Sequence, residues 1–233
     1  MNPLKNMVQG FSHLLFPSVC VGCGEELNHA NQLVCLRCFH QLPETHFYDF
    51  PDNPIEKIFW GRVPILAASC HYYFSKQSIL QNIVHQFKYE GKKQVGEQFG
   101  KLMAEALLQS PRFSELDALL PLPLFANRQK KRGYNQALVL CESIAKRMKI
   151  PVLSNAMQRI SATETQTHKS RIDRWRNMEG KFQLVNIASL RNKHVLLVDD
   201  IITTGATIDA CASELLLVEG IRISIAALAY TVI

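Results

Sequence analysis

The segment from His194 to Tyr230 constrains the fold more than any other part of the chain. It opens with an apolar, β-branched run from His194 to Val198, which is typical of a buried strand. Apolar residues then recur at helical spacing from Thr207 to Glu219, and Gly220 ends that pattern before a second strand-like run begins at Ile221. Two strands joined by a crossover helix pair in parallel. The sequence therefore predicts an α/β fold with a mainly parallel sheet flanked by helices.

Small polar residues fill the junction between the first strand and its helix: Asp199, Asp200, Thr203, Thr204, Gly205, Ala206 and Thr207. Ligands of parallel sheets bind beyond the carboxyl ends of the strands, where two carboxylates can accept hydrogen bonds from two sugar hydroxyls. The N–H groups that open a helix favour a phosphate, and Gly205 lets the backbone approach it closely. The junction predicts a site for a ribose 5-phosphate. The alternative is that the aspartates only end the strand and Thr-Gly forms an ordinary turn.

The order of four apolar residues, Asp-Asp, two apolar residues and Thr-Thr-Gly-x-Thr closely resembles the motif of type I phosphoribosyltransferases. That resemblance implies that Asp199 and Asp200, as catalytic and substrate-binding residues, contact the ribose of phosphoribosyl diphosphate, while residues 203–207 hold its 5-phosphate. Mg²⁺ would be carried largely by oxygens of the ligand. Hypoxanthine-guanine enzymes of this fold have an acidic residue where Thr203 stands here, which argues against purine salvage of that kind.

Further segments resemble the ComF/GntX family in their order along nearly the whole chain from Cys20. They are Lys88-Tyr89-Glu90-Gly91, Leu120-Pro-Leu-Pro-Leu124 with Arg128, Lys131-Arg132-Gly133-Tyr134-Asn135-Gln136, and Gln166-Thr167 with Arg174 and Asn177. The resemblance implies a role in natural transformation or in the use of external DNA. Two departures are Tyr134, where the family usually has Phe, and His168-Lys169, which replaces a small and an apolar residue. Other DNA-uptake proteins, such as a helicase, are further candidate partners.

Four of the seven cysteines lie in two CxxC pairs, Cys20 with Cys23 and Cys35 with Cys38. Four thiolates can enclose a tetrahedral zinc ion with no open position, so the spacing predicts a structural zinc site. The alternatives are fortuitous free thiols or a redox pair. We expect residues 1–60 to form a double zinc-knuckle module and residues 61–233 to form the phosphoribosyltransferase-like domain. The isolated cysteines at positions 70, 141 and 211 are expected in the core.

The remaining pattern predicts the other elements of the larger domain. Strands are expected at 65–74, 116–120, 152–157 and 181–185, and helices at 79–87, 95–107 and 137–148, with Ser75 available to cap the first helix. The basic segment around Arg128 to Arg132 is expected to be a loop. Residues 161–180 show no sustained apolar period and are expected to form a mobile loop that can close on pyrophosphate.

The formal net charge of +6 permits phosphorylated or nucleic-acid partners. Arg128 and Arg132 are candidates for binding the pyrophosphate group. The candidate contacts to single-stranded DNA are Arg37, Lys130, Lys131, Arg132, Arg171, Arg174 and Arg176. The alternative for all of these side chains is an ordinary solvated surface or structural ion pairing.

The N-terminal residues lack a continuous apolar core and a cleavage site, and no run of about 18 apolar residues occurs, so a soluble cytoplasmic protein is expected. No residue identifies an acceptor for a phosphoribosyl group. Whether the chain catalyses transfer therefore stays open at this point. The alternatives are an active phosphoribosyltransferase of nucleotide salvage and a regulator of nucleotide metabolism.

Overall fold

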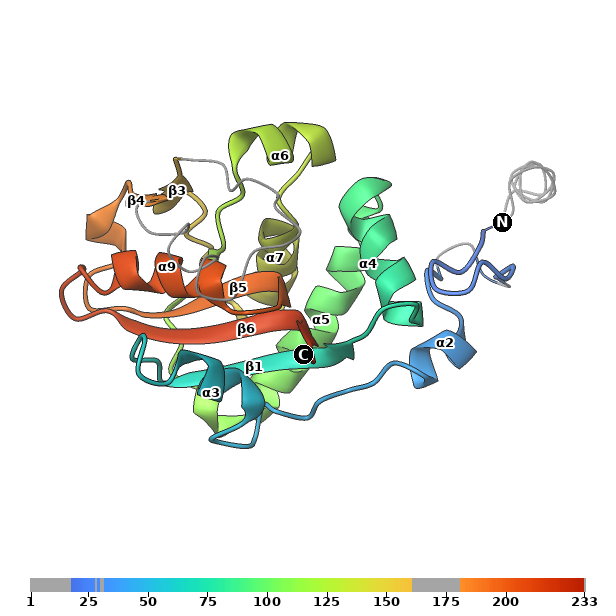
Figure 1. The fold of residues 1–233 in the computed structure, drawn as a ribbon, viewed down its shortest axis with the longest axis horizontal. Coiled ribbons are helices and arrows are strands. Elements are labelled where there is room, and N and C mark those ends of the chain that lie inside the picture. The colour runs from blue at the N-terminus through green and yellow to red at the C-terminus, as the bar shows by residue number, and fades with distance from the viewer. Residues whose placement is uncertain (1–17, 28, 30–31, 161–180, 233) are drawn as a thin grey trace.

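A computed structural model describes residues 18–27, 29, 32–160 and 181–232. Within these ranges, the main sheet has four strands in the order β1-β6-β5-β2 (Figure 1). Their bounds are β1 Ala67–Phe74, β2 Ala118–Pro121, β5 His194–Ile202 and β6 Arg222–Thr231. Every neighbouring pair is parallel, as the sequence predicts. The strand β5 continues past Val198 through both aspartates, so they belong to the strand rather than to the loop after it.

Side chains of β5 alternate between two hydrophobic clusters, one on each face of the sheet. Leu196 and Val198 pack with the helices α4 (Ile79–Tyr89), α5 (Lys93–Gln109) and α7 (Gln136–Met148). Val195 and Leu197 pack with α3 (Pro54–Phe59) and α9 (Ala206–Leu215). Figure 1 shows α3 and α9 on one side of the sheet and α5 and α7 on the other. Two short 3-10 helices cover Pro111–Phe113 and Ile187–Ser189.

Two local predictions about helices are wrong. The basic segment expected to be a loop forms the helix α6 (Ala126–Arg132), which ends at Gly133 in the left-handed conformation. None of its residues is buried, so it carries no apolar period by which the sequence could reveal it. The cap of α4 is Ser78 rather than Ser75, because the Ser78 hydroxyl accepts a hydrogen bond from the Gln81 N–H at 3.1 Å.

The prediction of a strand at 152–157 is also wrong. Val152 makes only an isolated bridge to Leu119, and a turn follows before β3 (Met157–Arg159). This short strand pairs antiparallel with β4 (Phe182–Leu184), which confirms the expected strand at 181–185. The resulting β3–β4 hairpin lies beside α9 and outside the main sheet (Figure 1). The expected mobile loop at 161–180 lies outside the described residues.

The cysteine-rich segment packs on α4. It contains a bridge between Val19 and Glu26 and the short helix α2 (Leu36–His40). The Asn82 side chain of α4 donates a hydrogen bond to the Gly22 carbonyl at 2.8 Å. Cys20, Val21, Leu27, Val34 and Cys38 share one hydrophobic cluster with Leu80 and Ile83 of the same helix.

Residues 43–60, here called the strap, run along the outer edge of β1 and then cover the sheet with α3. The Thr45 N–H donates to the His71 carbonyl at 3.0 Å, and the Tyr73 N–H donates to the Pro43 carbonyl at 2.8 Å. Such cover protects the exposed edge of a sheet from pairing with another chain. The expected module boundary at residue 60 stays a prediction, although Ile55 and Phe59 of the strap are fully buried against the sheet.

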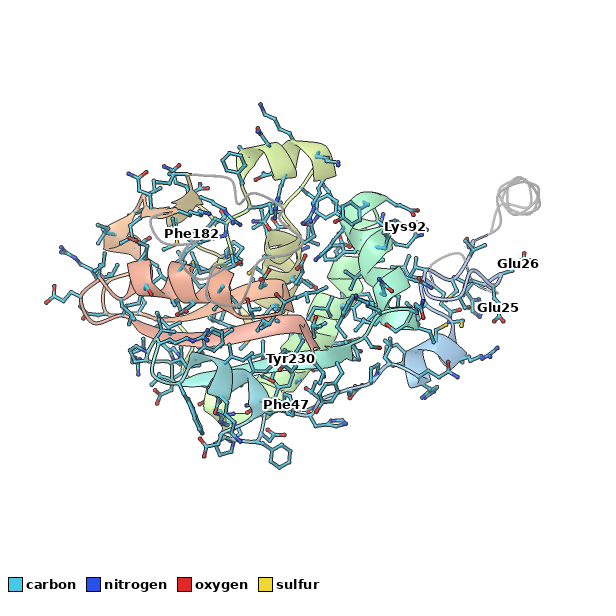
Figure 2. The ribbon with its side chains drawn as sticks, viewed as in Figure 1. Glu25, Glu26, Phe47, Lys92, Phe182 and Tyr230 are labelled. Carbon is cyan, nitrogen blue, oxygen red and sulfur yellow. The ribbon has the colours of Figure 1, made fainter. Side chains whose placement is uncertain are left out.

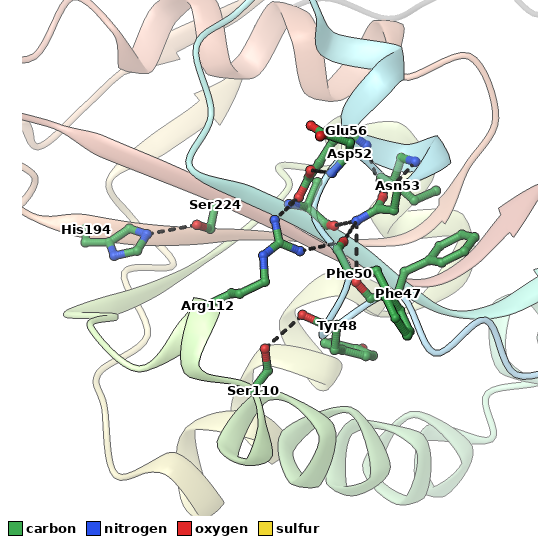
Figure 3. A network of polar contacts seen from close by, with 12 residues as sticks. Phe47, Tyr48, Phe50, Asp52, Asn53, Glu56, Ser110, Arg112, His194 and Ser224 are labelled. Carbon is green, nitrogen blue, oxygen red and sulfur yellow. Dashed lines mark hydrogen bonds and ion pairs between the residues drawn. The ribbon is translucent and has the colours of Figure 1, made fainter.

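A polar network fixes the strap in place (Figure 3). The Asn53 side-chain oxygen accepts hydrogen bonds from the first turn of α3, and its amide donates to the Ala68 carbonyl of β1 at 2.8 Å. Glu56 accepts a hydrogen bond from the Ala68 N–H at 3.0 Å and forms an ion pair with Arg112.

None of the helices in the described ranges is long and apolar enough to cross a membrane.

Candidate functional site

The junction of β5 and α9 presents backbone N–H groups at the carboxyl edge of the sheet. Gly205 is the N-cap of α9, with φ of 74°, so the cap position has no side chain to satisfy the first turn of the helix. The Thr204 hydroxyl accepts one hydrogen bond from the Ala206 N–H at 3.5 Å. Thr203 is exposed and Thr207 is half-buried. A helix start with this geometry can bind a phosphate through its N–H groups.

Asp200 is held by a lysine from the opposite side of the site. Its carboxylate forms an ion pair with Lys88 at 2.9 Å, and both side chains are largely buried, with 11% and 15% exposed. Lys88 lies in the last turn of α4, so this helix reaches from the cysteine-rich segment to the ligand site. The sequence singles out Lys88 only as part of the Lys-Tyr-Glu-Gly segment that resembles the ComF/GntX family. Its pairing with Asp200 has no sequence signal because the two residues lie far apart along the chain.

Asp199 has a different environment from Asp200. Burial, and then the charge of Asp200, raise the pKa of the Asp199 carboxyl to about 7, although Lys88, the Asp200 N–H and Arg159 act in the opposite direction. Its charge also raises the pKa of the Cys211 thiol on α9, so Asp199 faces the side of the sheet that carries α9 and the hairpin. A carboxyl group with this pKa can accept or release a proton near neutral pH.

The end of α4 and the end of α6, which are distant in sequence, meet beside this site. The Tyr134 hydroxyl donates a hydrogen bond to the Phe87 carbonyl at the end of α4. Arg132 lies over the Tyr89 ring at 5.3 Å and donates to the Gln136 side chain at 2.9 Å. Tyr134 therefore contributes a hydrogen bond that a phenylalanine at the same position would lack.

A cavity of about 500 Å³ lies beside the site, between the end of β2, the start of α6 and the β3–β4 hairpin. Its lining includes Pro121, Asn135, Asn155, Gln158 and Arg159. Sequence reasoning misses Arg159 and the cavity, because the apolar pattern assigns part of the hairpin to a longer strand. Arg128 of α6 is half-buried, and its positive charge lowers the pKa of Arg159.

The four clustered cysteines come together as predicted. Their sulfur atoms all lie within 4.8 Å of one another, and the Sγ atoms of Cys23 and Cys35 are 3.8 Å apart. A tetrahedral zinc site with Zn–S bonds of about 2.3 Å requires sulfur–sulfur distances of about 3.8 Å, so the cluster fits a metal ion. The Gly22 and Cys35 N–H groups donate to the Cys20 sulfur at 3.4 and 3.3 Å.

These contacts also favour the thiolate. Burial raises the pKa of Cys20, but backbone hydrogen bonds from Cys35, Cys23 and Gly22 outweigh that effect and lower it to about 7. Hydrogen bonds to the charged form of a group stabilise that form. The Cys20 sulfur is therefore prepared to bind a metal, which takes the thiolate form of cysteine. Burial, and then hydrogen bonds with the neighbouring thiols, instead raise the pKa of Cys38.

Of the residues predicted to contact DNA, those that the structure describes do not gather on one surface. Lys130 and Lys131 are exposed on α6, whereas Arg37 lies on α2 and pairs with Glu25 at 3.5 Å. Figure 2 shows Glu25 at the end of the molecule opposite Phe182, whereas α6 lies above the sheet in Figure 1. The other three candidates, Arg171, Arg174 and Arg176, lie outside the described residues.

Comparison with known proteins places this chain in a family. Competence protein F of Haemophilus influenzae is 31% identical over 194 residues, which cover 82% of this chain and 75% of that protein. The chain belongs to the competence protein F family. DNA utilization protein YhgH of Salmonella typhi is 29% identical over 85% of this chain and 78% of its own. Competence protein ComFC of Bacillus subtilis is 26% identical with the same coverage.

The family model of the phosphoribosyl transferase domain matches residues 135–231 of this competence protein F relative. The match begins just before α7 and includes the complete β5–α9–β6 unit with both aspartates and residues 203–207, the predicted phosphate loop. Together with the parallel sheet, this match confirms the type I phosphoribosyltransferase fold. The cysteine cluster lies outside the matched range, in the N-terminal segment that packs on α4.

Proposed function

We propose that this protein binds phosphoribosyl diphosphate with Mg²⁺ at the β5–α9 junction and acts in DNA uptake or in the use of external DNA. The observation that carries the first part is the order of groups at this junction. Two carboxylates, Asp199 and Asp200, precede a helix start whose cap is Gly205 in the left-handed conformation. Carboxylates suit ribose hydroxyls, and the N–H groups of the helix start suit the 5-phosphate.

The charges around the junction suit the rest of the ligand. Lys88 reaches Asp200, and Arg132 is held over Tyr89 on the same side. Positive side chains in a partly buried site stabilise a pyrophosphate group, both when it is bound and when it departs. When bound, Mg²⁺ would neutralise part of the pyrophosphate charge, chiefly through oxygens of the ligand. The cysteine cluster would hold one structural zinc ion.

Removal of the Asp200 carboxylate tests the ligand site. We expect Asp200→Asn to weaken phosphoribosyl diphosphate binding about 10- to 100-fold in calorimetry with Mg²⁺, because a hydrogen bond to a charged group contributes about 1.5–3 kcal/mol. The substitution also leaves Lys88 without its carboxylate partner in a largely buried position. The double variant Asp200→Asn/Lys88→Met removes both charges, and thermal unfolding shows whether each variant is folded.

Glu105→Gln provides the matched control. Glu105 pairs with Arg147 at 2.6 Å, but both side chains are exposed on the surface of α5 and α7. This variant should bind phosphoribosyl diphosphate as the wild type does. Unchanged affinity in folded Asp200→Asn would refute the assignment of the ribose site, and no binding by the wild type would refute the proposed ligand.

The DNA part of the proposal draws on the relatives, whose names refer to competence and DNA utilization, and on the net charge of +6. The last turn of α6 offers three basic residues in succession, of which Lys130 and Lys131 are exposed. Phosphate contacts from such residues bind single-stranded DNA with little dependence on base sequence.

Salt dependence tests this surface. We expect Lys130→Ala/Lys131→Ala to weaken binding to a fluorescent single-stranded oligonucleotide. The slope of log affinity against log salt should become shallower by about 0.7 for each DNA phosphate that the variant no longer neutralises. Lys101→Ala/Lys146→Ala changes the net charge equally, at exposed positions on α5 and α7. Equal slopes in both double variants would show that α6 is not the contact surface.

A further inference from the structure

We propose that Gly22 and Asn82 are positioning residues of the ligand site. Through helix α4, they make the position of Lys88, and with it the affinity for phosphoribosyl diphosphate, depend on the metal-loaded cysteine cluster. This inference rests on the proposed binding of both the ligand and the zinc ion. It goes further by giving the cysteine-rich segment a role in ligand binding as well as in local stability.

Gly22 connects the cysteine cluster to α4 through hydrogen bonds of its own backbone. Its N–H donates to the Cys20 sulfur at 3.4 Å, and its carbonyl accepts a hydrogen bond from the Asn82 side chain at 2.8 Å. Cys20 is one of the four proposed zinc ligands, whereas Asn82 lies in the first half of α4. A change at the Cys20 sulfur therefore reaches α4 through a single intervening residue.

Gly22 also lies in close contact with α4. A Cβ atom at this position would lie 2.8 Å from Ile79 Cγ2 at the start of α4 and 3.2 Å from the Cys38 sulfur. Gly22 does not have a positive φ, so its backbone conformation does not require glycine. The small size of the residue instead allows α4 and the second CxxC pair to approach it from two sides.

Helix α4 is short enough to depend on such contacts. It has 11 residues, and an isolated helix of fewer than about 12–15 residues is only marginally stable in water. Its order therefore depends on the burial of its apolar face, which comprises Leu80, Ile83, Val84 and Phe87. Asn82 and Lys88 lie about 9 Å apart along its axis, at a rise of about 1.5 Å per residue. Support at Asn82 thus acts on Lys88 through one continuous helix.

The other end of α4 lies at the ligand site. Lys88 is in the last turn, and its Nζ atom is 2.9 Å from a carboxylate oxygen of Asp200, with both side chains largely buried. The Tyr134 hydroxyl holds the same end through the Phe87 carbonyl. Helix α4 is therefore held between the cysteine-rich segment and the ligand site (Figure 1). Loss of the first support allows the helix to shift or fray. The Lys88–Asp200 pair is sensitive to such a shift, because the attraction between charges in a partly buried site depends strongly on their separation.

Thermodynamic linkage makes this coupling reciprocal. If zinc in the cluster raises the affinity for phosphoribosyl diphosphate by some factor, the ligand must raise the affinity for zinc by the same factor. Couplings between distant sites commonly amount to about 5- to 150-fold. We expect a value near the lower end of this range, because Tyr134 still holds the end of α4 when zinc is removed.

Calorimetry with and without zinc tests the coupling. The probe is phosphoribosyl diphosphate with Mg²⁺, titrated into the full chain before and after treatment with a chelator that prefers zinc to magnesium. We expect the zinc-free protein to bind the ligand about fivefold more weakly. The zinc affinity, measured by competition with a chromophoric chelator, should rise by the same factor when the ligand is present. Lys88→Met should bind the ligand more weakly than the wild type, and equally well with and without zinc.

Variants that keep their zinc separate positioning from metal binding. Asn82→Ala removes the hydrogen bond to Gly22 without changing a cysteine, and it should bind the ligand about two- to tenfold more weakly. Gly22→Ala should have a similar effect, because its Cβ atom displaces Ile79. Gly22→Ala/Ile79→Ala makes room for that atom and should restore the affinity of Ile79→Ala alone. Glu105→Gln is again the control, because it changes only an exposed surface pair.

Hydrogen exchange provides a readout that needs no ligand. After zinc removal, the amides of α4 as far as Lys88 should exchange faster, while those at the centre of β5 keep their rates. Thermal unfolding shows whether each variant is folded.

The proposal is overturned if exchange at the end of α4 is unchanged, or if the folded protein binds phosphoribosyl diphosphate equally well with and without zinc. Unchanged affinity in zinc-loaded Asn82→Ala and Gly22→Ala would overturn the role of these two residues. Failure of the ligand to bind the wild type would instead overturn the proposed function, and the absence of zinc from the wild type would contradict the proposed metal ion.

Discussion

Gly205→Val is expected to abolish phosphoribosyl diphosphate binding and to lower the free energy of unfolding by about 2–6 kcal/mol. A β-branched residue is rarely found at a φ of 74° and costs about 1–3 kcal/mol there. A Cβ atom at this position would also lie 2.5 Å from Ile58 Cγ2 and 3.1 Å from the Phe59 ring. Such overpacking costs a further 1–3 kcal/mol or so. Urea unfolding and calorimetry measure the two effects.

Two further variants separate backbone strain from the steric clash. Gly61→Val introduces the same side chain at a φ of 70°, where a Cβ atom would have nothing within 4 Å. It should cost only the backbone strain and leave ligand binding intact. Gly205→Ala/Ile58→Ala should be more stable than the sum of the two single changes predicts, because Ile58 is the nearest obstacle. Additive effects would show that the contact between residue 205 and α3 contributes nothing to the loss of stability.

Cys20→Ser/Cys35→Ser is expected to remove bound zinc and to unfold the cysteine-rich segment while the main sheet persists. Metal analysis should fall from about one zinc per chain to nearly none, since each CxxC pair loses a ligand. Metal binding and local folding are coupled in such sites, so the segment should lose its protection from proteolysis. Circular dichroism of the α/β domain should change little.

Cys141→Ala is the control for the loss of a thiol. Cys141 is fully buried in α7 and lies in the core between α5 and the sheet. The variant should retain all of its zinc, although it loses some stability from the smaller side chain. Full retention of zinc by the Cys20/Cys35 double variant would contradict the predicted metal site.

The central part of the fold could be predicted because its strands are buried on both faces. The run from Val195 to Val198 is apolar throughout, and the helical spacing that follows the strand differs clearly from it. The same unit contains the aspartates and the phosphate loop, so the candidate ligand site follows from the sequence as well. The CxxC spacing likewise predicts a cysteine cluster that the structure confirms.

The parts that could not be predicted lack a local apolar pattern. Helix α6 buries none of its residues, and β3 has three residues after a turn. Helix α3 does have a signal, since Asn53 caps it and Pro54 begins it, but the surrounding turn residues obscure that signal. The Lys88–Asp200 pair and the position of Arg159 depend on tertiary contacts, which a single sequence does not display.

The strap has a consequence for how the molecule opens. Helix α3 lies directly behind Gly205, and Arg62, which follows the strap, reaches Asp209 in the first turn of α9 at 3.8 Å. Regions that share buried contacts of this kind open together in native-state hydrogen exchange. We therefore expect the amides of α3 and of the β5–α9 junction to open as one cooperative unit. A phosphate bound at the junction should slow exchange in α3, which it does not touch.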